Sequence, residues 1–416
     1  MSTTTISSPF AAAATALAPG ALHKLQSQGR ARLEQLGYPG PRDEAWRFTP
    51  LAQTLTTSWQ VAGADADYPA VPDFALNGYR VILRNGRVDL KASKLPEAAS
   101  VSSFATLADA PVELNQLFAE SAQSFAALNA SAAVDGVVIR VPAGVTIDAP
   151  IHLVHLMAGE DVSAHPRHLI VAERGSACTV VESCFGVGTY VANPATEIFV
   201  AESATVNHVR LQQDSMTATH LGLIAAQVAG DATLHSYAVS LGAALSRTEI
   251  DVVMTAPGGH VGLHGLYSAK DKQVADFHTS LDHAHPDCTS EQMYKGVLDD
   301  RGRGVFAGRI MVRQDAQRTA AMQTNRALLL SDDAKVNTMP QLEIFADDVS
   351  CTHGATIGEL DEKALFYMQS RGIDEASARS ILTYAFADEA IIGLPVDVVR
   401  RYIESQLTGH EEGMTA

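Results

Sequence analysis

Hydrophobic positions near both ends of the chain recur at helical spacing. Leucines three, four, seven or eight positions apart predict a helix over residues 10–37, which Gly37 and the prolines that follow it should end. Towards the C-terminus, residues 360–371 begin with acidic side chains and stop at Gly372, which predicts a second helix. Asp374 is the expected N-cap of the next helix, and Pro395 suits the first turn of another. Both ends should therefore be helical.

From Val134 onwards the pattern changes to short runs rich in β-branched residues. The runs cover residues 137–142, 168–172, 179–183, 196–201 and 205–211. Similar small-residue turns begin at Glu173, Glu202, Gly230 and Pro257, with steps of 29, 28 and 27 residues between their starts. A fixed period made of strands and tight turns, with no helix between them, is typical of a solenoid whose coils share one core. We therefore predict a parallel β-helix over residues 131–355, with a β-sandwich as the alternative.

This pattern divides the chain into three regions. Residues 1–130 form a helical and mixed N-terminal region, residues 131–355 the β-helix core, and residues 356–416 a helical C-terminal region. An open solenoid exposes strand edges at its ends, which have to be covered or used for binding. Helical regions at both termini would provide such covers.

The composition narrows the class of protein. The 416 residues carry a formal net charge of −17, which argues against binding to nucleic acid or to an anionic membrane surface. No apolar run approaches the roughly 18 residues needed to span a membrane. Four cysteines in so long a chain fit a reduced, cytoplasmic protein better than a disulfide scaffold. The N-terminus has no basic segment before its alanine run, so a secretory signal is not expected.

Four potential metal ligands lie close together in the sequence: His278, His283, His285 and Cys288. On a strand His283 and His285 would share a face and could converge on a metal, as in a metal-dependent hydrolase. Alternatively, the imidazoles hydrogen-bond a turn while Cys288 is buried as a small apolar side chain. A carbohydrate-active β-helix enzyme would need paired carboxylates, but Asp347 and Asp348 are adjacent, and on a strand they would face opposite sides.

Cys351 and His353 form a second candidate site. Two positions apart on a strand, they would point to the same side, as a pair of metal ligands or as a nucleophile with its base. One thiol and one imidazole cannot complete a four-ligand site, so further ligands would have to come from elsewhere, including another subunit. A purely structural pair at the end of the solenoid is the other interpretation. The chain has no G-x-x-x-x-G-K-[ST], G-x-S-x-G or H-E-x-x-H motif, so we do not expect an enzyme.

Two long stretches resemble a known family. The run S-E-Q-M-Y-K-G-V-L-D-D-R-G-R-G-V-F-A-G-R-I and the run P-Q-L-E-I-F-A-D-D-V-S-C-T-H-G-A-T-I-G are similar to the SufB/SufD family of iron–sulfur cluster assembly proteins. The N-terminal P-R-D-E-A-W-R-F-T-P-L is similar as well. The short chain with few cysteines looks like the SufD branch. This resemblance implies a right-handed parallel β-helix core flanked by helical N- and C-terminal regions.

The resemblance also implies partners and a function. It implies a non-catalytic scaffold that works with a SufB-like paralogue and with SufC, an ABC-type ATPase. A transient iron–sulfur cluster would form at the contact with SufB, with His353 first and Cys351 second as contributors from this chain. No cofactor is expected to be tightly bound to the chain alone, which could pair with a second copy as a homodimer. The implied SufC-binding residues lie on the C-terminal helices: Leu365, Phe366, Tyr367, Arg371, Ile381 and Tyr384.

Overall fold

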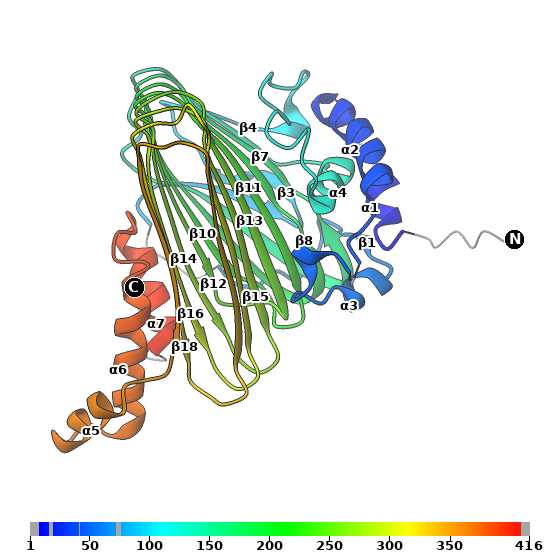
Figure 1. The fold of residues 1–416 in the computed structure, drawn as a ribbon. Helices are drawn as coiled ribbons and strands as arrows, with labels where there is room; N and C mark the ends of the chain where they lie inside the picture. Colours follow the sequence, from blue (N-terminus) through cyan, green and yellow to red (C-terminus); the bar gives the residue numbers. More distant parts are fainter. Residues whose placement is uncertain (1–7, 16–19, 41, 72–75, 409–416) are drawn as a thin grey trace, which may run out of the picture.

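The protein is a β-solenoid with helices packed on two opposite sides (Figure 1). The computed structural model describes residues 8–15, 20–40, 42–71 and 76–408. It is 45% strand and 19% helix, and the solenoid has about eight turns. The predicted mainly β class, with helical regions at both ends, is confirmed.

Two parallel ladders run along the solenoid, and each coil contributes a strand to both. The first ladder contains β2 (Tyr79–Arg84), β6 (Ile151–Ala164), β8 (Ala177–Ala192), β10 (Thr205–Gln213), β12 (Thr233–Ser240), β14 (His260–Ala269), β16 (Thr289–Leu298), β18 (Thr319–Leu329) and β20 (Val349–Gly358). The second contains β5 (Val137–Val141), β7 (Arg167–Ala172), β9 (Ala195–Val200), β11 (Thr219–Val228), β13 (Leu245–Met254), β15 (Val274–His283), β17 (Arg303–Val312) and β19 (Lys335–Ile344). Apolar side chains from both ladders meet between them and form the core.

The turns predicted from the sequence period stack directly on one another. The Gly175 N–H donates to the carbonyl of Glu202, and the Ser203 N–H donates to that of Gly230. The Asp231 N–H donates in turn to the carbonyl of Pro257. The repeat read from the sequence is therefore the coil of the solenoid. Its step varies, since Thr205 pairs with Thr233, 28 residues on, whereas Thr289 pairs with Ala320, 31 residues on.

The N-terminal region combines short helices with short strands. The helices and 3-10 turns are α1 (Ala11–Thr15), η1 (Gly20–Leu22), α2 (His23–Leu36), η2 (Glu44–Trp46), α3 (Ala52–Thr56), η3 (Phe104–Thr106) and α4 (Ser124–Ala132). The short strands are β1 (Gln60–Val61), β3 (Arg87–Lys94) and β4 (Ser100–Ser103). The single helix predicted over residues 10–37 is not continuous, because Gly20 has a φ of 75° and starts a 3-10 turn. Residues 16–19 of that prediction lie outside the described residues.

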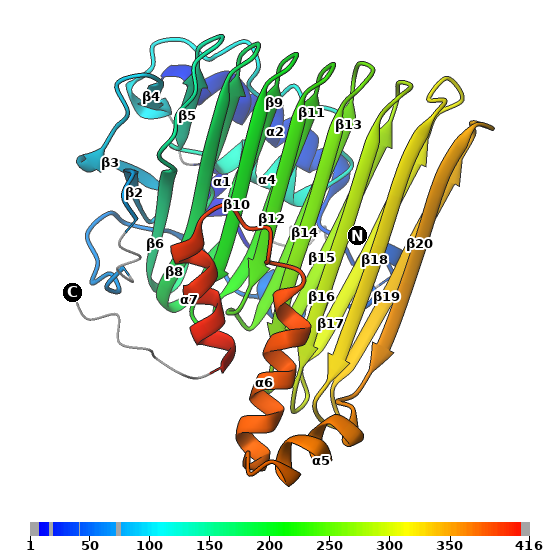
Figure 2. The same ribbon diagram turned by 90° about the vertical axis from the view of Figure 1, so that its left-hand side faces the viewer.

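The helices cover the outer faces of the two ladders. The N-terminal helices pack through Phe10 and Phe125 on β11, β13 and β15. At the other end of the chain, α5 (Glu362–Ser370), α6 (Glu375–Asp388) and α7 (Asp397–Thr408) follow β20, and α6 and α7 lie across the first ladder (Figure 2). Val399 and Ile403 of α7 are fully buried, which stabilises this contact by roughly 1.5–3 kcal/mol per side chain.

Candidate functional site

The end of the solenoid at β19 and β20 is open. Within the described residues β20 pairs only with β18 and β19 only with β17, so no further coil covers these strands (Figure 2). Most residues of β20 are exposed, whereas the preceding strand of its ladder, β18, is buried at alternate positions. The side chains beside this edge include four exposed apolar ones: Met322, Ile344, Phe345 and Ile357. A long edge with apolar side chains favours pairing with another chain.

Cys351 and His353 lie on β20 at this open end. Cys351 pairs in register with Ala321, and His353 pairs with Gln323. The half-buried Cys351 packs against the solenoid core, so its face of the strand points inwards. Because side chains alternate along a strand, His353 shares that inward face, yet it is exposed because nothing lies above β20. The two side chains therefore line the mouth of the solenoid interior, as two ligands or as a structural pair.

The thiol of Cys351 is not activated by its own chain. Burial raises its pKa, and a hydrogen bond from the backbone of Ala321 lowers it only in part. The thiol is therefore protonated at neutral pH. To bind a soft metal, Cys351 needs a nearby positive charge, supplied by the metal itself or by a partner.

The residues from His278 to Cys288 have separate environments. His278 contacts the Asp276 carboxylate at 3.1 Å, and buried His283 contacts the Ser290 hydroxyl at 2.9 Å. Cys288 is fully buried in the core, which corresponds to the structural alternative. His285 lies in the turn after β15 rather than on the strand, so it does not continue the face of His283.

Two further observations concern the rival enzyme classes. Among the described residues, no group of three or more histidine, cysteine, aspartate or glutamate side chains is arranged to hold a metal ion. Asp347 and Asp348 lie in the turn before β20 and not on a strand, so the expected opposite orientation does not apply to them. Both are exposed at this turn.

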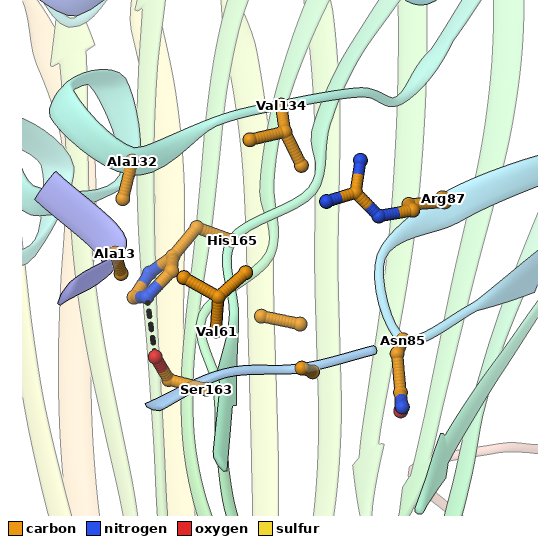
Figure 3. Close-up of a pocket in the computed structure, with 10 residues that line it drawn as sticks. Ala13, Val61, Asn85, Arg87, Ala132, Val134, Ser163 and His165 are labelled. Carbon is orange, nitrogen blue, oxygen red and sulfur yellow. Dashed lines mark hydrogen bonds between the residues drawn. The ribbon is translucent and has the colours of Figure 1, made fainter. Parts of the chain in front are cut away.

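Two hollows accompany the solenoid, and neither includes Cys351 or His353. A cavity of about 10 Å³ beneath the N-terminal region is lined by His165, Ser163 and Arg87 among others, and it has room for about one water molecule (Figure 3). In this cavity His165 contacts the Ser163 hydroxyl at 3.2 Å. A wide, shallow hollow of about 570 Å³ lies over the stacked turns at Asp231 and Gly258.

The C-terminal helices begin and end close to where the sequence predicts. Asp361 caps α5, Asp374 caps α6, and Gly372 has a φ of 90° between them. No residue of α5 is buried, and this helix projects from the body (Figure 1). Of the six predicted SufC-binding residues, Phe366, Tyr367, Arg371 and Ile381 are exposed, while Leu365 and Tyr384 are half-buried.

A buried ion-pair network inside the solenoid was not predicted. Glu182 of β8 accepts two hydrogen bonds from Arg210 of β10, at 3.0 and 2.8 Å, and one from His208 at 3.1 Å. Glu182 and Arg210 are 28 residues apart and paired in register, so the predicted coil period already placed them in neighbouring coils.

Comparison with known proteins identifies the family. Residues 155–386 match the family described as "SUF system FeS cluster assembly, SufBD core domain", and residues 11–153 match the SufBD protein N-terminal region. The chain belongs to the SufBD family. Its members are iron–sulfur cluster assembly proteins, so this chain is a component of that process. The SufBD core match includes Cys351, His353 and α5.

Three curated SufBD relatives are similar over most of their length. A SufBD family protein of Synechocystis is 32% identical over 388 residues, covering 88% of this chain and 85% of the relative. The iron–sulfur cluster assembly protein SufD of Escherichia coli is 32% identical over 381 residues, covering 88% of both chains. The chloroplastic protein ABCI7 of Arabidopsis thaliana is 29% identical over 415 residues, covering 94% of this chain and 86% of the relative. No helix among the described residues is long and apolar enough to cross a membrane.

Proposed function

We propose that this chain is a SufD-type scaffold subunit that supports iron–sulfur cluster assembly at an interface with a SufB-like paralogue. The observation that carries this proposal is the position of His353 and Cys351 on the inward face of β20, at the uncovered end of the ladder. Soft thiolate and imidazole ligands suit iron and its clusters. Two ligands leave the coordination incomplete, so the partner supplies the others.

The open edges of β19 and β20 are the surface offered to the SufB-like partner. Strand addition would satisfy their free backbone groups and bury the apolar side chains beside them, such as Phe345. A second copy of this chain would meet the same edge chemistry, so the isolated protein would form a homodimer by the same contact. The cluster is cargo of the assembled complex and is not tightly bound to the chain alone.

The C-terminal helices are the docking element for SufC, the ABC-type ATPase. In support, α5 buries none of its residues and presents Phe366 and Tyr367 to solvent. Nucleotide-driven closure of two SufC subunits would pull on α5 and α6, and the movement would reach the contact with the SufB-like partner. The chain itself remains a scaffold and not an enzyme.

Co-expression of the chain with a SufB-like and a SufC-like protein tests the proposal. We expect a stable complex, with Phe366→Asp losing SufC but keeping SufB, because the substitution puts a charge in an apolar contact. In the intact complex, His353→Ala should slow cluster formation, followed by visible absorbance, at least tenfold. His23→Ala, an exposed histidine on α2, is the matched control and should assemble clusters at the wild-type rate.

Two results would contradict the proposal. Cluster formation by His353→Ala at the wild-type rate would remove the ligand role. Absence of a complex with either partner would remove the scaffold role.

A further inference from the structure

A column of polar side chains runs along the inward face of the first ladder towards the open end. Gln292 of β16 pairs in register with Gln323 of β18, and Gln323 pairs with His353 of β20. Both glutamines are at most 1% exposed, whereas His353 at the end of the column is exposed. Gln323 is therefore the side chain directly beneath His353.

The hydrogen bonds below Gln323 set the direction of its amide. The Thr279 hydroxyl donates to Oε1 of Gln292 at 2.9 Å, and Nε2 of Gln323 donates to the same oxygen at 3.2 Å. With Gln292 held in this way, a reversed Gln323 amide would bring two carbonyl oxygens together, which is unfavourable. The Nε2 of Gln323 therefore faces β16.

The oxygen of this amide has no partner. Nitrogen and oxygen lie on opposite sides of a planar amide, and β16 and β20 lie on opposite sides of β18, so Oε1 of Gln323 faces the β20 side. It is fully buried and accepts no hydrogen bond in the structure. An unpaired buried carbonyl oxygen is uncommon and favours any arrangement that supplies a donor. The His353 ring, on the same face of the next strand, carries such an N–H.

We propose that Gln323 is a positioning residue that accepts the N–H of His353. This contact holds the ring in a single tautomer and turns the lone pair of its other nitrogen towards the open end. Metal-binding histidines generally donate their second N–H to a carbonyl or carboxylate, which fixes the ring orientation. The link to cluster assembly rests on the proposed function, but the contact between Gln323 and His353 does not.

The tautomer of His353 is measured by imidazole ¹⁵N chemical shifts in the labelled full-length chain, with His353→Ala to assign the signal. We expect one tautomer in the wild type and a mixture of both in Gln323→Met, which keeps the side-chain length but removes the acceptor. Gln323→Glu restores an acceptor and should restore the single tautomer. Gln341→Leu, an exposed glutamine on β19, is the control and should leave the signal unchanged.

The outcomes separate this inference from the proposed function. A tautomer mixture in the wild type overturns the inference without any variant, and so does an unchanged signal in a folded Gln323→Met chain. If Gln323→Met alters the tautomer while His353→Ala still assembles clusters at the wild-type rate, the positioning contact stands and the ligand role of His353 fails.

Discussion

Glu182 shows how this solenoid tolerates charge in its interior. It is fully buried and accepts hydrogen bonds from Thr196, His208 and Arg210. Burial by itself would raise the pKa of Glu182, but the charge of Arg210 and the hydrogen bond from His208 hold it well below its usual range. The carboxylate is therefore ionised, and its stability depends on the presence of Arg210.

Replacing Glu182 with Gln should destabilise the protein strongly. The substitution leaves the Arg210 charge buried without a counter-charge, which typically costs about 3–5 kcal/mol of the free energy of unfolding. Urea denaturation at neutral pH measures the loss. The control is Glu202→Gln, which removes an exposed ion pair with Arg174 and should cost at most about 1 kcal/mol. A loss of similar size in the two variants would contradict the prediction.

The sequence allowed some of these residue pairs to be predicted and not others. The steps of 27 to 29 residues between turns match the separation of Glu182 from Arg210, so that pair was within reach. Gln323 and His353 are 30 residues apart, in later coils where the turns had not been aligned. The inward direction of Cys351 also depends on its contact with the core, which sequence alternation does not fix.

At the scale of elements, one side chain connects α6 to the solenoid. Lys295 leaves the outer face of β16, and its ammonium group donates to the Phe386 carbonyl at 2.8 Å and to the Glu389 carboxylate at 2.5 Å. The same group lies 4.4 Å from the centre of the Phe386 ring. Burial lowers the pKa of Lys295, and Glu389 offsets part of that effect. The ion pair therefore attaches α6 to the strand that also carries Gln292.

Lys295→Met should loosen α6 without unfolding the solenoid. Glu389 is partly exposed and can be solvated once its partner is lost, so we expect a cost of about 1–3 kcal/mol that is confined to the helices. Hydrogen exchange should speed up in α6 and α7 but not in β12 or β14. Lys363→Met, on the exposed surface of α5, is the control. Unchanged exchange in α6 would show that the apolar contacts alone hold it.

The extents of the C-terminal helices were predictable, but their packing was not. Asp361, Gly372 and Asp374 are local signals, and they fix the ends of α5 and α6 to within about two residues of the prediction. The contact of Lys295 with Glu389 joins residues that no period relates. Likewise, the positive φ of Gly20 interrupted a helix that leucine spacing alone predicted as continuous.

At the scale of the whole molecule, buried histidines should make the fold sensitive to acid. Burial lowers the pKa of His152 and His155 to about 3, and that of His165 and His168 to about 4. The unfolded chain binds these protons below about pH 6.5, whereas the native state does not. Stability is therefore fully present above pH 6.5 and is lost as the pH falls towards 4. At pH 5 the loss is about 2 kcal/mol per histidine.

Urea midpoints between pH 7.5 and pH 5 test this expectation. The midpoint should fall steadily across this range, and hydrogen exchange at pH 5 should rise first in β6 and β7, which carry three of these histidines. A midpoint that does not change over this range would contradict the prediction. Asp214, whose pKa is lowered by its contacts with His220 against the opposing effect of burial, adds a further loss only below about pH 4.

The variable coil step has a consequence for how such a chain can change during evolution. Strand register is kept from coil to coil, although paired residues are separated by 27 positions at His260 and by 31 at Ala320. The extra residues must be accommodated in the turns, which lie outside the ladders. Insertions or deletions of a few codons at the turns are therefore tolerated, whereas a single-residue insertion within a strand would reverse every side chain after it. Paralogues with coils of unequal length can thus still present matching final strands.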